Sequence, residues 1–166
     1  MRKLHLIPLF ICIGLFQMKA TAQVQLITTV PITVPTVLDL SLTSGSLNTF
    51  NFNTTSLIDL GITLSSATTL TYKSNQAWHV TIAAASANFT SASATPMPAS
   101  VIQYRLHGSG SYTALSATAV SLLGTTGSPV TRGTGTIVLD FFLNPGYSYA
   151  PATDYTMTIK YTITNP

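Results

Sequence analysis

Residues 24–42 read VQLITTVPITVPTVLDLSL and alternate along their whole length. Every even position carries an apolar residue or threonine, and side chains of an extended chain switch sides at each residue, so these positions share one face. As one straight strand the stretch would measure roughly 60 Å, whereas strands in compact domains seldom exceed about 10 residues. Either the chain bends at Pro31 or Pro35 and crosses to a second sheet, or its first part leaves the domain and completes a neighbour. Both alternatives remain open at the level of sequence.

The other end of the chain shows the same alternation in residues 155–164. Tyr155, Met157, Ile159, Tyr161 and Ile163 fall on one face, and threonines and a lysine fall on the other. This pattern predicts a half-buried antiparallel strand.

Shorter runs of strand length lie between the two ends, separated by turn sequences such as Asn144-Pro145-Gly146. Two segments are less regular: 83–100 is expected to form a long loop anchored by Phe89, and 57–64 is either a strand or a helical turn. The pattern predicts an all-β fold, an antiparallel Ig-like β-sandwich of roughly seven to nine strands. The expected strands between the ends are 70–73, 78–84, 101–106, 112–115 and 136–143.

The first 22 residues have the features of a secretory signal peptide. Basic Arg2 and Lys3 precede an apolar run, and Ala20-Thr21-Ala22 is a small-x-small cleavage site. We therefore expect residues 1–22 to be removed and residues 23–166 to form a single domain. The expected location is extracellular or on the cell surface, with the periplasm as an alternative, and no other stretch is long enough to span a membrane.

Charge and composition narrow the function classes. The formal charge of +3 comes from Arg2, Lys3 and Lys19, all in the expected signal peptide, so the remaining chain is close to neutral and nucleic-acid binding is not expected. Serine and threonine make up 44 of the residues from 23 to 166, and glutamate is absent. This composition is typical of a secreted β-rich protein with an uncharged polar surface.

No arrangement of residues predicts catalysis, a metal site or a cofactor site. His79 alternates with Trp78 and Val80 and is expected to point away from the core, and His107 precedes a glycine-containing turn. Asp39 and Asp140 are expected within strands, whereas Asp59 and Asp154 flank expected turns and so take ordinary solvated positions. No zinc-type spacing or nucleophile motif occurs. The four aspartates are Asp39, Asp59, Asp140 and Asp154.

Two groups of residues are candidates for binding. The first could add as a strand to another sheet, because alternate side chains would fill pockets while the main chain forms hydrogen bonds; it consists of Val24, Leu26, Val30, Ile32 and Val34. The second consists of the aromatic residues Trp78, Tyr147 and Tyr149, whose flat rings suit a glycan or another protein.

Three stretches together resemble bacterial cell-surface domains of the WxL type. Val34-Pro35-Thr36-Val37-Leu38 is similar to their early motif, Trp78-His79-Val80 to their Trp-x-Leu motif with Val for Leu, and residues 155–166 to their distal motif with Tyr161 for Trp. The resemblance implies a non-catalytic surface β-sandwich that attaches to peptidoglycan. The chain also resembles spore-coat-U-like and fimbrial secreted β-domains, which end in a similar strand and which sometimes polymerise by strand donation.

These observations favour a non-catalytic, secreted cell-surface protein of structural or adhesive type that assembles by strand addition through residues 24–35. The expected partner is a cell-wall component or another copy of the chain, giving a homo-oligomer. The alternative is a peptidoglycan- or glycan-binding module of the WxL type. In that case Trp78, Tyr147 and Tyr149 would contact the ligand.

Overall fold

The computed structural model describes residues 28–45, 50–92 and 96–166. Contacts divide the chain into two units, Met1–Thr33 and Val34–Pro166, and the second unit contains all the regular secondary structure of the described residues. Its elements are, in order, β1 (Leu38–Ser44), α1 (Thr55–Leu60), β2 (Ile62–Ser74), β3 (His79–Ala84), the 3₁₀ turn Ala99–Val101, β4 (Ile102–Leu106), β5 (Thr113–Ala114), β6 (Val120–Leu123), β7 (Gly133–Leu143) and β8 (Ile159–Thr164).

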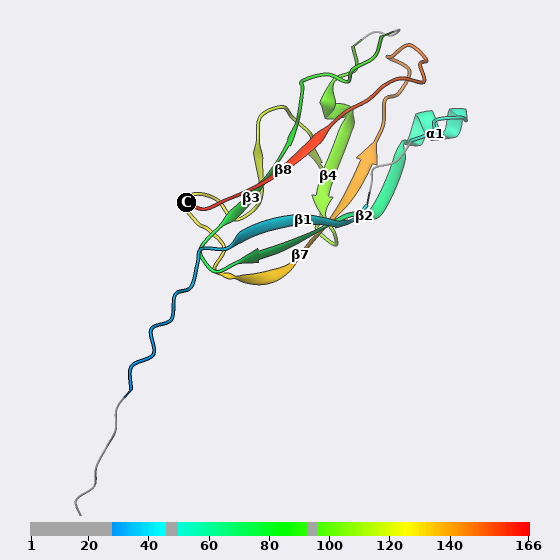
Figure 1. Cartoon of the computed structure of the whole chain (residues 1–166). Coiled ribbons are helices and arrows are strands. Elements are labelled where there is room, and N and C mark those ends of the chain that lie inside the picture. Colours follow the sequence, from blue (N-terminus) through cyan, green and yellow to red (C-terminus); the bar gives the residue numbers. More distant parts are fainter. Residues whose placement is uncertain (1–27, 46–49, 93–95) are drawn as a thin grey trace, which may run out of the picture. The chain divides into compact units, whose positions relative to one another are not determined.

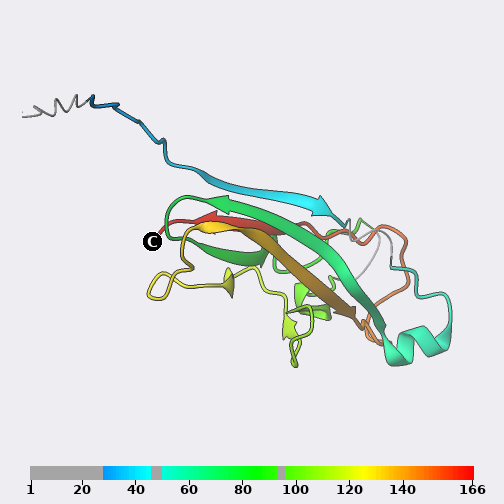
Figure 2. The same cartoon turned by 90° about the horizontal axis from the view of Figure 1, so that it is seen from below.

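The eight strands of the described chain form two antiparallel sheets packed face to face (Figures 1 and 2). The larger sheet has the order β1-β2-β7-β4-β5, and the smaller sheet has the order β6-β3-β8. Because every strand pair is antiparallel, the predicted all-β antiparallel sandwich is confirmed. Five strands face only three, so the smaller sheet leaves the margins of the larger one less covered.

The core lies between the central strands β3 and β7. Trp78, just before β3, is 0% exposed; its ring lies 4.2 Å from that of Tyr72 between centroids, and its indole N–H donates to the carbonyl of Thr131. Gly135 on β7 makes room for this stack, since a Cβ there would lie 2.5 Å from the Tyr72 hydroxyl. The alternation of apolar residues predicted this inward face correctly for Val80 and other β3 residues.

Segment 57–64 contains both of the structures that its pattern allowed. The Thr54 hydroxyl accepts a hydrogen bond from the Leu57 amide and caps the start of α1. Gly61, with φ of +76°, caps its end after Leu60. Strand β2 then begins at Ile62 and continues through 13 residues, past a register shift between Leu64 and Thr68. Of the loop predicted for 83–100, Ala83 and Ala84 belong to β3 and Ala99 begins the 3₁₀ turn, while the described residues between them form only isolated bridges. Phe89 packs against the core as expected.

Residues 28–37 belong to neither sheet. The end of this segment is bonded to the sandwich: Asn75 donates to the carbonyl of Pro35 and accepts from the amide of Val37. A bend at Pro31 or Pro35 into a second sheet of the same domain, one of the two alternatives for the long stripe, is therefore not what the structure shows. Val24 and Leu26 lie outside the described residues.

Candidate functional site

A row of exposed apolar side chains precedes β1. Val30 is 70% exposed, Ile32 is 81% exposed and Val34 is 73% exposed. Threonines and prolines separate them, so an extended chain would present the three aliphatic side chains on one face. Burial of large aliphatic side chains is favourable, so these three residues would stabilise a contact in which another surface covers them.

Among the described residues, the sandwich has two strand edges without a partner strand on one side. β1 ends the larger sheet and β8 ends the smaller one, and the two strands contact each other across the sandwich (Figures 1 and 2). Their inward side chains are only half-buried although they pack against the core. These residues, which we call the edge seam, are Leu38, Leu40, Ile159, Tyr161 and Ile163.

The hydrogen-bonding pattern shows which backbone groups of β8 are available. The Ala85 amide donates to the carbonyl of Thr158, which makes these two residues a hydrogen-bonded pair in the ladder of β3 and β8. Such pairs recur every two residues in an antiparallel ladder, so the amides and carbonyls of Ile159, Tyr161 and Ile163 face away from β3. The same three residues thus contribute side chains to the edge seam and main-chain groups to the free edge.

The aromatic candidates have different environments. Trp78 was predicted as a ligand contact, but this is wrong, because a residue with no exposed surface cannot touch a ligand and its N–H is already bonded inside the core. Tyr147 is 68% exposed, and a hydrogen bond to Asp59 raises the pKa of its hydroxyl. Tyr149 is half-buried in the same loop. Of the three aromatic candidates, only the two loop tyrosines therefore have exposed surface that a ligand could contact.

Asp140 lies within a strand, β7, as expected, and it is buried with 1% of its surface exposed. Its carboxylate accepts hydrogen bonds from the Ser66 amide at 2.8 Å and from Arg105 Nε at 3.0 Å, and its other close partner is His107 Nδ1 at 2.8 Å. Burial alone would raise the pKa of Asp140, but these bonds outweigh it and lower that pKa. The sequence feature that indicates such partners is the position of Asp140 inside the apolar run 137–143. A carboxylate in a buried strand requires hydrogen-bond or charge partners.

The neighbourhood of Asp140 includes a serine and a histidine but lacks the geometry of a nucleophile relay. The Ser66 hydroxyl lies 3.3 Å from His107 Nδ1, the same ring nitrogen that faces Asp140. In a relay the serine and the carboxylate face opposite nitrogens of the imidazole. One nitrogen accepts the proton of the serine, and the N–H of the other nitrogen donates to the carboxylate. The cluster instead joins the irregularity of β2, where Ser66 has φ of +50°, to strands β4 and β7.

Within the described ranges, no three His, Cys, Asp or Glu side chains gather as a metal site. No helix in that part of the chain has the length and apolar character to cross a membrane. No protein-family model matches the chain, and no curated protein matches it either.

Proposed function

We propose that this is a non-catalytic, secreted cell-surface protein of structural or adhesive type, whose copies assemble by strand addition. The donor is residues 24–35 of one copy, and the acceptor is the free edge of β8 in the next. The observation that carries the proposal is the exposed row Val30, Ile32 and Val34, which lies outside both sheets. Removal of a signal peptide at residues 1–22 during secretion would free this segment to act as a donor.

The donor and the acceptor complement each other in two ways. The main chain of the donor can pair with the amides and carbonyls of β8 that face away from β3, extending the smaller sheet to four strands. Its aliphatic side chains would then cover the edge seam, and each buried Val or Ile side chain contributes about 1.5–3 kcal/mol. The intervening threonines would face water, as the threonines of β8 do.

Strand addition of this kind joins two different surfaces, the donor of one copy and the edge of another. Such a contact is heterologous, and it continues from copy to copy unless the geometry closes a ring. The expected product is a linear, non-covalent polymer at the cell surface. A cell-wall component is the second proposed partner, and the exposed ring of Tyr147 supports this alternative of a peptidoglycan- or glycan-binding module.

The experiment compares two neighbouring substitutions in the secreted chain, Ile32→Asp and Thr33→Asp. Both add one negative charge to the same segment, but only Ile32 lies on the aliphatic face. We expect Ile32→Asp to convert the assembled protein into monomers, and Thr33→Asp to leave its mass distribution unchanged, as measured by sedimentation velocity. A synthetic peptide of residues 24–35 should bind the monomeric Ile32→Asp variant, whose acceptor edge is intact.

Three outcomes contradict the proposal. Wild type that sediments as a monomer over the whole concentration range would show that the segment is not a donor. Equal effects of the two substitutions would show that charge, rather than the aliphatic face, governs assembly. The third outcome has two parts: wild type does not assemble but binds purified cell wall, and Tyr147→Ala loses that binding. The glycan-binding alternative would then replace strand addition.

A further inference from the structure

The two edges of the donor segment differ in their capacity for hydrogen bonds. Within residues 28–35 the large aliphatic side chains occupy even positions, whereas Pro31 and Pro35 occupy odd positions. The main-chain groups of an extended chain point to opposite edges at successive residues, just as the side chains point to opposite faces. Proline has no N–H. The edge formed by the even residues is therefore complete, and the edge formed by the odd residues lacks two donors.

Strand β8 also links one face to one edge. Ile159, Tyr161 and Ile163 turn their side chains into the edge seam and their amides and carbonyls away from β3. A donor that covers the edge seam turns its aliphatic side chains inward as well. Which edge of the donor then faces β8 depends on the direction of the donor.

Only an antiparallel donor turns its complete edge toward β8. In an antiparallel pair, two residues that exchange hydrogen bonds lie directly opposite each other with their side chains on the same face. The inward residues Val30, Ile32 and Val34 would thus bond to the inward residues of β8. In a parallel pair, a residue that bonds to the partner strand lies opposite one whose main-chain groups face away. The odd edge of the donor would then face β8, with no N–H at Pro31 and Pro35.

A donor that closed on β8 of its own copy would have to be parallel. Figures 1 and 2 show that β1 and β8 run in opposite directions and that β1 begins at the end of the sandwich where β8 ends. Asn75 bonds the main chain at Pro35 and Val37, just before β1, so residues 28–35 could reach this β8 only by turning back along it in its own direction. An antiparallel donor on the same copy would place Pro35 at the far end of the six-residue strand β8, roughly 20 Å away, whereas the chain from residue 35 to residue 38 spans at most about 11 Å.

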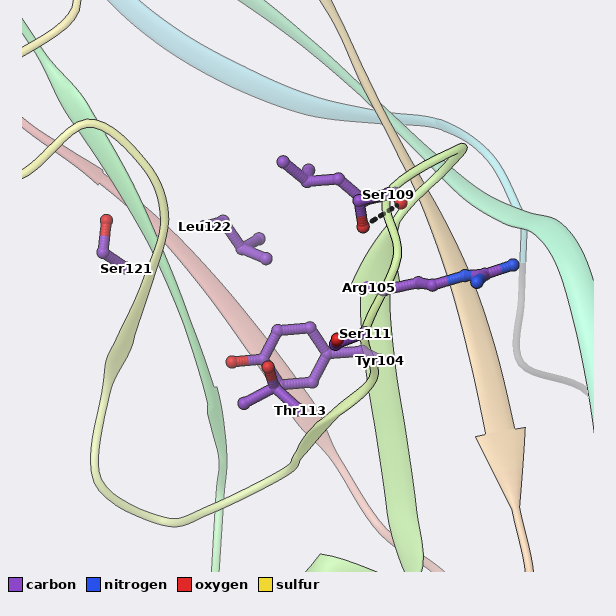
Figure 3. A pocket seen from close by; sticks show the side chains of 8 residues that line it. Tyr104, Arg105, Ser109, Ser111, Thr113, Ser121 and Leu122 are labelled. Carbon is purple, nitrogen blue, oxygen red and sulfur yellow. Dashed lines mark hydrogen bonds between the residues drawn. The ribbon is translucent and has the colours of Figure 1, made fainter.

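The other edge strand of the smaller sheet, β6, is a poorer acceptor than β8. It has four residues, and beside it, between β6 and β5, lies a hollow of ≈ 200 Å³ whose lining residues are mostly polar (Figure 3). Two hydroxyls of this lining donate within the chain, that of Ser109 to the carbonyl of Leu106 and that of Ser121 to the carbonyl of Gly124. An aliphatic donor therefore matches the edge seam beside β8 better than the polar surroundings of β6.

We propose, on the basis of the strand addition described above, that Pro31 and Pro35 restrict the donor to antiparallel pairing with β8. This orientation makes the pairing intermolecular, because closure within one copy requires a parallel donor. The two prolines then lie on the outer edge of the added strand, where no N–H is needed for the pairing with β8. A further strand would find two donors missing at that edge, so each β8 edge accepts one donor.

The experiment measures the direction of the synthetic peptide of residues 24–35 on the ¹⁵N-labelled Ile32→Asp secreted chain. A nitroxide at the N-terminus of the peptide should broaden amide signals more strongly near Thr164 than near Ile159, and a nitroxide at its C-terminus should give the opposite gradient. The reverse assignment of the two gradients would show parallel pairing. That result would overturn the restriction to antiparallel pairing and leave strand addition intact.

Methylation of single main-chain nitrogens provides a matched pair of peptides. Methylation at Ile32 removes an N–H from the even edge, and methylation at Thr33 makes the same change on the odd edge, with both side chains retained. We expect the first peptide to bind about tenfold or more weakly than the unmodified peptide, because a β8 carbonyl loses its partner, and the second to bind within about twofold. Equal weakening by the two changes, or weakening by methylation at Thr33 alone, would overturn the proposal.

Strand addition itself fails in a different way. If the unmodified peptide does not bind the Ile32→Asp chain at all, the acceptor edge is wrong, and the role of the prolines falls with it. If the peptide binds Ile32→Asp but not a monomeric wild type, the segment has closed on its own β8, which contradicts the antiparallel restriction.

Discussion

Replacing Asp140 by asparagine tests how much the buried ion cluster stabilises the fold. The carboxylate has three close partners, the Ser66 amide, His107 Nδ1 and Arg105 Nε, at 2.8, 2.8 and 3.0 Å. Asparagine has one acceptor oxygen. If that oxygen keeps the bonds on the side of Ser66 and His107, its NH₂ group faces the Arg105 N–H, so two donors meet.

The magnitude follows from the burial of the two charges. Losing a hydrogen bond to a charged group costs about 1.5–3 kcal/mol, and breaking a fully buried ion pair costs about 3–5 kcal/mol. The Arg105 side chain is 26% exposed, so water can solvate part of its released charge. We therefore expect Asp140→Asn to lower the free energy of unfolding by about 2–3 kcal/mol near neutral pH.

The effect should depend on pH with a defined sign. The pKa of Asp140 is lowered in the folded protein, whereas an unfolded aspartate titrates near about 3.9. Its stabilisation is therefore fully present above about pH 5 and is lost as the pH falls through the folded pKa. Urea unfolding followed by fluorescence of Trp78, the only tryptophan, should show a lower stability of Asp140→Asn than of wild type above about pH 5, and this difference should shrink in more acidic buffer.

The matched control is Asp39→Asn on β1. Asp39 is exposed and lies opposite Lys73 in the strand register, so its replacement should change the free energy of unfolding by less than about 0.5 kcal/mol. A stabilising role of the cluster around Asp140 is refuted if Asp140→Asn costs no more than Asp39→Asn. It is also refuted if the cost of Asp140→Asn stays the same or grows in acid.

Two further predictions concern the core and a turn. Gly61→Ala should lower stability by about 1–3 kcal/mol in urea unfolding, because φ is +76° and the new Cβ would lie 2.6 Å from the Leu143 carbonyl oxygen. Gly110→Ala, with nothing within 4 Å of the added Cβ, should be nearly neutral; equal effects would contradict the geometry. Fluorescence of Trp78 should be blue-shifted and poorly quenched by acrylamide, since its side chain is 0% exposed; quenching as strong as that of free tryptophan would contradict its burial.

Much of the strand content could be predicted from local patterns. Alternation predicted the positions of β3, β4 and β7, and it placed β8 within 155–164. Alternation missed β6, because Val120–Leu123 is short and its burial pattern does not alternate regularly. It also missed the length of β2, since the irregularity between Leu64 and Thr68 changes which face each side chain occupies.

The candidate sites were less accessible to sequence reasoning. The exposed row before β1 was found as a donor candidate from its spacing, but the choice between a bend and a free segment needed the strand pairing. The partners of Asp140 also come from distant strands that the sequence does not place side by side.

Local alternation specifies the all-β class, the inward face of each main strand and the aliphatic face of residues 24–35, because side-chain direction in a strand is a local property of the backbone. The packing of the chain, in contrast, sets which strands pair, that five described strands face three, that β8 has an edge without a described partner strand, and that Asp140 and Trp78 are buried. These properties depend on contacts between segments far apart in the chain. No local pattern specifies such contacts, because many pairings of the same strands satisfy the same alternation.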